Sequence, residues 1–83
     1  MMKLFSIKDF KAGTFTQPSM FRTTDEAIRN FAIVVNTDGN LVHDCPKDFA
    51  LYEVGIFDVE SGCITCDGIN IVADAIQLVK VGE

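Results

Sequence analysis

The chain has 83 residues, of which 48% are hydrophobic, and this composition excludes an intrinsically disordered tail. No apolar run reaches the roughly 18 residues of a membrane span, and the first residues lack the apolar core and cleavage site of a signal peptide. We therefore expect a soluble cytosolic protein, and the length of the chain is that of one domain over residues 1–83. The net charge of −5 argues against strong non-specific nucleic-acid binding by a monomer.

The N-terminal third predicts strands and a loop. Residues 3–10 are rich in strand-forming side chains and alternate in part, with Phe5 and Ile7 on one face. Residues 12–19 contain Gly13 and Pro18 and predict a loop or an irregular edge. A short strand is expected at 20–22.

Residues 23–36 predict the main helix. Thr23 followed by Glu26 three residues later is the signature of a capping box. Apolar residues recur at helical spacing and form one stripe that we expect to face the core: Ala27, Ile28, Phe31, Ala32, Val34 and Val35. The turn-forming residues 36–40 end the helix.

The C-terminal half predicts a hairpin. Residues 41–48 form a connection, because Pro46 prevents a regular helix through it. Residues 49–58 predict the strongest strand, with Ala50, Tyr52, Val54 and Ile56 on one face and Phe49, Leu51 and Phe57 on the other. Residues 59–62 form a turn, and roughly 62–66 return as the antiparallel partner.

The last element is ambiguous. Residues 69–81 contain strand-forming Ile and Val together with a helical spacing of Ala73, Ala75, Ile76 and Val79. We expect a short, weak helix there. The resulting fold class is α+β, with a small, mostly antiparallel sheet packed on one main helix at about residues 24–36.

The three cysteines raise the question of a metal site. His43, Cys45, Cys63 and Cys66 are the residue types that bind zinc. However, positions i and i+3 of a strand point to opposite faces, so Cys63 and Cys66 would need a tight loop to share an ion. Free thiols in a reducing compartment are the favoured interpretation, so we expect neither metal nor cofactor.

No known catalytic motif is present. The chain has one histidine and lacks a nucleophile elbow, a phosphate-binding loop and a dinucleotide-binding fingerprint. The neighbouring acids Asp58 and Glu60 flank a turn, where such side chains usually bond to the backbone. We therefore expect a protein that is not an enzyme.

Basic and aromatic residues alternate in the first third. Residues 1–30 carry a charge of +2, whereas residues 31–83 carry −7. Proteins that bind single strands combine a basic track with aromatic faces on which bases stack. The candidate DNA-binding residues are Lys3, Lys8, Phe10, Lys11, Phe15 and Arg22. The alternative is that the phenylalanines are core and the lysines are simply solvated.

Short motifs in residues 3–65 resemble the small nonstructural protein of gokushoviruses, which are single-stranded DNA bacteriophages of the Microviridae. The resemblance rests on the DFKAGTF and EAIRNF segments and on an ordered set around the hairpin: Pro46, Asp48, Phe49, Leu51, Gly55, Phe57, Asp58 and Gly62. Phe49 replaces the family's usual hydroxyl-bearing aromatic residue. The cysteines lie outside the family pattern, and the resemblance does not rest on residues after 66.

The resemblance implies a function in the bacterial host cytoplasm. Such proteins are described as DNA-binding accessory proteins of phage replication that act at the switch to single-strand synthesis. The net charge supports a competing hypothesis, an acidic adaptor that docks on a phage or host replication protein without touching DNA. Apolar residues on both faces of a strand also favour a homodimer, because an unpaired strand edge can pair with a second copy.

Overall fold

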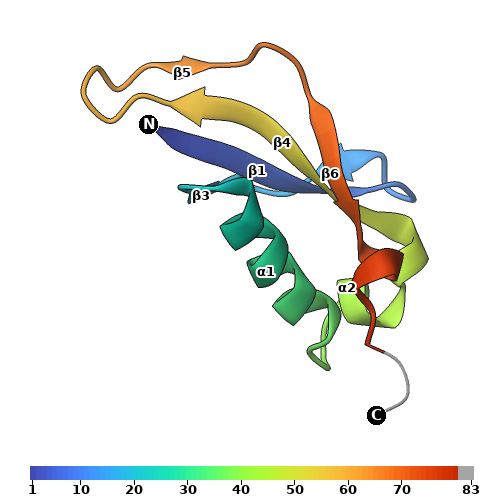
Figure 1. Cartoon of the computed structure of the whole chain (residues 1–83). Helices are drawn as coiled ribbons and strands as arrows, with labels where there is room; N and C mark the ends of the chain where they lie inside the picture. The colour runs from blue at the N-terminus through green and yellow to red at the C-terminus, as the bar shows by residue number, and fades with distance from the viewer. Residues whose placement is uncertain (81–83) are drawn as a thin grey trace.

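The protein folds as one antiparallel sheet covered on one face by helices (Figure 1). The structure is a computed structural model that describes residues 1–80. The strands are β1 (Met2–Asp9), β2 (Thr14–Phe15), β3 (Ser19–Phe21), β4 (Phe49–Phe57), β5 (Ile64–Thr65) and β6 (Asn70–Asp74). The helices are α1 (Thr24–Val35), the short α2 (Leu41–Asp44), and two 3-10 turns, η1 (Pro46–Asp48) and η2 (Ala75–Leu78). The predicted α+β class is confirmed.

The two long strands, β1 and β4, pair along their whole length and form the centre of the sheet. At one end of this pair, β3 flanks β1 and β5 flanks β4. At the other end, β2 flanks β1 and β6 flanks β4. The outer strands are short, so the sheet presents only short free edges, which limits uncontrolled pairing with other chains.

Helix α1 forms where the capping signal predicts it. The Thr23 hydroxyl accepts a hydrogen bond from the backbone N–H of Glu26 at 3.1 Å. The Glu26 carboxylate reaches back to the N–H of Arg22 at 3.2 Å, one residue before the cap, so two backbone donors at the helix start are satisfied. The apolar stripe faces the sheet, and Ala27, Phe31 and Val35 are buried.

The core lies between α1 and one face of the sheet. Phe5 and Leu51 come from the central strands and meet Phe31 and Val35 of the helix, while Ala75 closes the far side. Phe5 and Phe21 pack edge to face with their ring centroids 6.0 Å apart. These contacts hold the sheet on one side, and no helix of residues 1–80 covers its opposite face (Figure 1).

The predicted hairpin of residues 49–58 and 62–66 is confirmed. Ile56 and Phe57 of β4 pair with Thr65 and Ile64 of β5. A bulge at Val54 shifts the register of β4 against β1 between Leu4 and Phe5. The predicted faces of β4 are therefore wrong beyond the bulge. Ile56 shares the face of Leu51, and Phe57 shares that of Tyr52, because one extra residue inverts the alternation.

Gly55 follows the bulge and lies against the neighbouring strand. A Cβ at this position would stand 2.9 Å from the backbone oxygen of Thr65. Only glycine allows this close approach of the two backbones, as its place within a strand indicates.

The expected C-terminal helix at 69–81 is wrong over the described residues. Asn70–Asp74 form strand β6, and only Ala75–Leu78 turn, as a 3-10 helix; residue 81 lies outside the described part. The free edge of β4 provides backbone partners for β6, and these outweigh a weak helical spacing. Asn36 then fixes the segment, because its amide donates to Leu78 O at 3.0 Å and accepts from Lys80 N at 2.9 Å.

We expect Asp58 to titrate at unusually low pH. Its carboxylate accepts hydrogen bonds from the N–H groups of Glu60 at 2.9 Å and Ser61 at 3.4 Å. These bonds, Glu60 first, lower the pKa of Asp58 below its ordinary value of 3.8. Since the folded pKa lies below the unfolded one, the stabilisation is present above pH 3.8 and is lost as the pH falls through the folded pKa.

Carboxyl chemical shifts followed by NMR during an acid titration measure this pKa directly. Asp58 should show a midpoint below 3.8. A Ser61→Pro variant, which removes one of the donors, should move the midpoint upward. A parent midpoint at or above the ordinary value would show that the turn does not hold the carboxylate.

Candidate nucleic-acid interface

The open face of the sheet, on the side away from α1, carries a lysine among aromatic rings. Lys8 follows Ile7 in β1, and because successive side chains alternate, it points away from the core that Ile7 contacts. Its neighbour across the sheet in β2 is Phe15. Tyr52 lies on the same face, because it pairs with Ser6.

The rings and the ammonium group form one cluster, which we call the lysine–aromatic cluster (Lys8, Phe10, Phe15 and Tyr52). Lys8 Nζ lies 5.2 Å from the ring centroid of Phe10 and 5.4 Å from that of Phe15. The Tyr52 ring meets Phe15 edge to face at 5.5 Å and Phe10 at 6.5 Å. Phe10 is 46% exposed and Phe15 42%, so both rings keep a large apolar surface in contact with water.

A fixed turn holds Phe10 and Lys11 beside the cluster. The Asp9 carboxylate accepts hydrogen bonds from the N–H groups of Lys11 at 3.0 Å and Ala12 at 3.1 Å. Gly13 closes the turn with a positive φ of 73°, a conformation that glycine adopts without strain. The N–H of Phe10 also donates to Asp48 O at 2.9 Å. The turn is therefore preorganised, and Lys11 lies exposed within it.

The chemistry of this cluster suits a nucleobase next to a phosphate. Exposed aromatic rings offer π faces to any base, and stacking of this kind tolerates different sequences. A lysine ammonium over the rings is attracted by their quadrupole and presents a charge that can meet a backbone phosphate. The cluster thus contains both components of a single-strand site within one patch.

The structure brings together only part of the predicted set. Lys8, Phe10 and Phe15 meet in the cluster, and Lys11 lies in the adjoining turn. Lys3 instead points toward the helix side, where its Nζ lies 3.8 Å from Glu53 and 3.4 Å from the Thr24 hydroxyl.

Arg22 is also separate from the cluster. Arg22 lies between β3 and α1, where it and Arg29 line a hollow that does not include the cluster residues. We therefore restrict the candidate interface to the open face.

Tyr52 is the residue that sequence reasoning missed. It lies outside the basic N-terminal third and counts as one apolar position of a central strand. The signal that could have found it is the β1–β4 pairing, which places Tyr52 opposite Ser6 and on the face of Lys8. That pairing is not visible in the local sequence.

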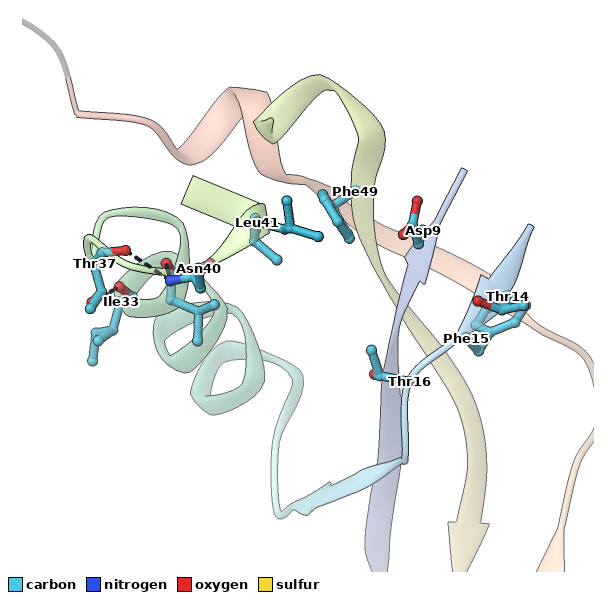
Figure 2. A pocket seen from close by; sticks show the side chains of 11 residues that line it. Asp9, Thr14, Phe15, Thr16, Ile33, Thr37, Asn40, Leu41 and Phe49 are labelled. Carbon is cyan, nitrogen blue, oxygen red and sulfur yellow. Dashed lines mark hydrogen bonds between the residues drawn. The ribbon is translucent and has the colours of Figure 1, made fainter. Parts of the chain in front are cut away.

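A second hollow adjoins the cluster on the helix side of β2 (Figure 2). It encloses about 400 Å³ between β2 and the ends of α1 and α2. Its lining includes Phe15 and Phe49 and the exposed apolar side chains of Ile33 and Leu41. Asn40 closes one end, where its amide donates to Thr37 O at 2.8 Å. The groove is mainly apolar and so suits a hydrophobic side chain better than a phosphate.

The four candidate zinc ligands do not converge. Cys45 precedes β4 and Cys63 follows it, so a nine-residue strand, about 30 Å long, separates them. His43 is engaged elsewhere, because its Nδ1 lies 2.9 Å from Val35 O and its Nε2 lies 2.9 Å from the Asp38 carboxylate. Cys45, Cys63 and Cys66 are exposed free thiols.

Comparisons with known proteins leave one finding. No curated protein and no solved structure matches the chain. A family model described as Phage ORF5 protein matches residues 2–78. Among residues 1–80, no helix is long and apolar enough to cross a membrane.

Proposed function

The chain belongs to the Phage ORF5 protein family, and on this premise we propose that it is a non-enzymatic accessory protein of phage DNA replication that binds single-stranded DNA through the open face. We place it in the gokushoviruses of the Microviridae, on the motifs quoted above. In this proposal it acts in the bacterial host cytoplasm, at the switch from duplex synthesis to single strands for packaging.

The observation that carries the proposal is the lysine–aromatic cluster. Its two half-exposed phenylalanines flank one ammonium group at 5.2 and 5.4 Å. Rings that served only to pack the hydrophobic core would be buried, and a soluble surface does not need exposed aromatic rings. Stacking platforms beside a cation are typical of proteins that bind single strands with little sequence preference.

Two ammonium groups can meet phosphate at this face despite a net charge of −5. Lys8 and Lys11 lie at one end of the sheet together with Asp9, Asp48 and Asp74, whereas Glu60 and Asp67 lie in the hairpin beyond the opposite end of β4. The Asp9 carboxylate already accepts the N–H groups of Lys11 and Ala12, so attraction of phosphate here comes from the two lysines, within the screening length of about 8 Å at physiological salt. Affinity should therefore depend strongly on ionic strength.

We expect binding of labelled oligo(dT) to weaken by about sevenfold between roughly 50 and 200 mM salt, the value for two phosphates neutralised on a single strand. In a Lys8→Glu, Lys11→Glu double variant, binding should nearly vanish. Fluorescence anisotropy measures both quantities.

A matched control separates a local effect from net charge. The control is Lys80→Glu, because Lys80 is exposed and lies beside α1, on the opposite side of the sheet from the cluster. This variant should bind within about twofold of the parent. Unchanged binding in the double variant would move the site elsewhere, and a parent that does not bind at all would overturn the proposal.

The groove beside β2 favours a second candidate function. Ile33 and Leu41 are 61% and 64% exposed at its mouth and could receive an apolar side chain of a phage or host replication protein. Such an adaptor would bind its partner with little dependence on salt. Absence of DNA binding together with salt-insensitive capture of a replication protein would favour this alternative.

A further inference from the structure

The hairpin beyond the core forms an arm that, within residues 1–80, pairs with β4 and is otherwise exposed. We call residues 58–69 the arm; they include β5. Only two residue pairs join β5 to β4, and residues 59–71 are all exposed. The molecule measures 45 × 26 × 19 Å, and Figure 1 shows β5 at the side of the sheet far from α1.

The arm has a defined shape. Asp58 N donates to Cys63 O at 2.9 Å and Gly62 N donates to Asp58 O at 2.8 Å. The Asp58 carboxylate bonds to the turn, and Ser61 Oγ accepts from Cys63 N at 3.2 Å. These bonds hold the turn of the arm in one conformation.

The exposed side chains of the arm are apolar and acidic. Val59 is 60% exposed, Ile64 66% and Ile69 53%, so three large aliphatic side chains of the arm stand in water. Glu60 and Asp67 add negative charge, and no basic residue occurs between Lys47 and Lys80. Several large apolar side chains exposed on one short segment are typical of an interaction surface.

A surface of opposite character lies between β3 and α1. It is a hollow of about 300 Å³ that Arg22 and Arg29 line together with Met20 and Ile33. Glu26 also lines it, but its carboxylate already accepts the N–H of Arg22 at 3.2 Å, so the two guanidinium groups set its character. Met20 is 51% exposed and Ile33 61%. Within residues 1–80, neither guanidinium forms an ion pair. We call this surface the β3–α1 hollow.

We propose that the protein forms a homodimer in which the arm of each copy docks in the β3–α1 hollow of the other. The aliphatic side chains of the arm would meet Met20 and Ile33, and its carboxylates would meet the two arginines. Pairing of two arms with each other would instead place acidic groups against acidic groups, which is unfavourable.

The size of the exchanged surface is sufficient. The arm has twelve residues and eight line the hollow, so up to 20 residues of each copy are available for the exchange. That number lies at the lower end of a standard interface, in which roughly 20–30 residues on each side contribute. A reciprocal exchange also closes on itself, so it yields a dimer and not a filament. The proposal is independent of DNA binding, because the two surfaces share no residue.

Light scattering coupled to size-exclusion chromatography tests the exchange. The parent, with a chain mass of 9.1 kDa, should elute with twice that mass at about 100 μM. Ile64→Asp should raise the dissociation constant by at least about 30-fold, the effect of removing a central interface contact. Leu41→Asp, which replaces an equally exposed side chain outside both surfaces, should leave the mass unchanged. Circular dichroism checks that each variant is folded.

Charge reversal makes the test specific to these two surfaces. A protein with Glu60→Lys and Asp67→Lys has a basic arm and a basic hollow, and should be monomeric. A protein with Arg22→Glu and Arg29→Glu has an acidic arm and an acidic hollow, and should also be monomeric. Mixing the two should restore a dimer, because each arm then meets a hollow of opposite charge.

Three results would overturn the proposal. The parent could remain monomeric up to about 200 μM, Leu41→Asp could dissociate the dimer as strongly as Ile64→Asp, or the mixed charge-reversed proteins could stay monomeric. If Ile64→Asp fails to fold, the charge-reversed pair alone decides, since its four substitutions lie on exposed polar positions.

Discussion

Replacing both Phe10 and Phe15 with alanine is expected to weaken single-stranded DNA binding more than 30-fold. Alanine substitution of a stacking residue typically costs about 1–3 kcal/mol per base, so two rings together account for at least about 2 kcal/mol. The salt dependence of the remaining binding should not change, because Lys8 and Lys11 are retained. This combination distinguishes stacking from phosphate contact.

Tyr52 provides an intrinsic probe for the same experiment. The chain has one tyrosine and no tryptophan, so its emission reports on the cluster alone. Stacking of a base on the platform should quench this emission on titration with oligo(dT). Leu41→Ala removes an exposed apolar side chain outside the cluster and should bind like the parent. Unaltered affinity in the Phe10, Phe15 variant would refute the stacking role.

Phe5→Ala is expected to remove most of the stability of the fold. Phe5 is 1% exposed, packs against Phe21 and faces the α1 stripe. Truncation of a buried phenylalanine typically costs about 3–5 kcal/mol. A chain of this length has a total stability of roughly 4–12 kcal/mol, so the variant should be marginally folded or unfolded at 37 °C.

Urea denaturation followed by circular dichroism measures the loss. Phe10→Ala is the matched control, since it removes the same side chain from a position that is 46% exposed. The free energy of unfolding of Phe10→Ala should fall by less than about 1 kcal/mol relative to the parent. Equal losses in the two variants would show that Phe10 belongs to the core and would weaken its assignment to the DNA site.

The main helix and the hairpin could be predicted because their signals are local. Thr23 and Glu26 lie within one helical turn, and the bonds they make are satisfied wherever the helix then packs. Asp58 likewise bonds to backbone groups two and three residues further along. Interactions over such short separations depend little on the remainder of the chain.

The candidate site could be predicted only in part. Lys8, Phe10 and Phe15 stand close in the sequence and meet through one hairpin between β1 and β2. Tyr52 joins them only because β4 pairs with β1, a contact across more than forty residues. Lys3 differs from Lys8 by five positions, which places the two side chains on opposite faces of the strand. The composition counts both as basic residues but does not show that they lie on different faces of the sheet.

The sequence by itself determined the elements whose reasons are local: the strands of residues 2–9 and 49–57, the capped helix, and the turn at Asp58. Tertiary structure alone decided three things. The bulge at Val54 inverted the faces of β4, the free edge of β4 drew Asn70–Asp74 into a strand, and the single layer of helices left one face of the sheet open. The physical reason is the same in each case. Backbone hydrogen bonds between strands are made with whichever partner the fold brings near, and a local pattern of side chains does not contain that information.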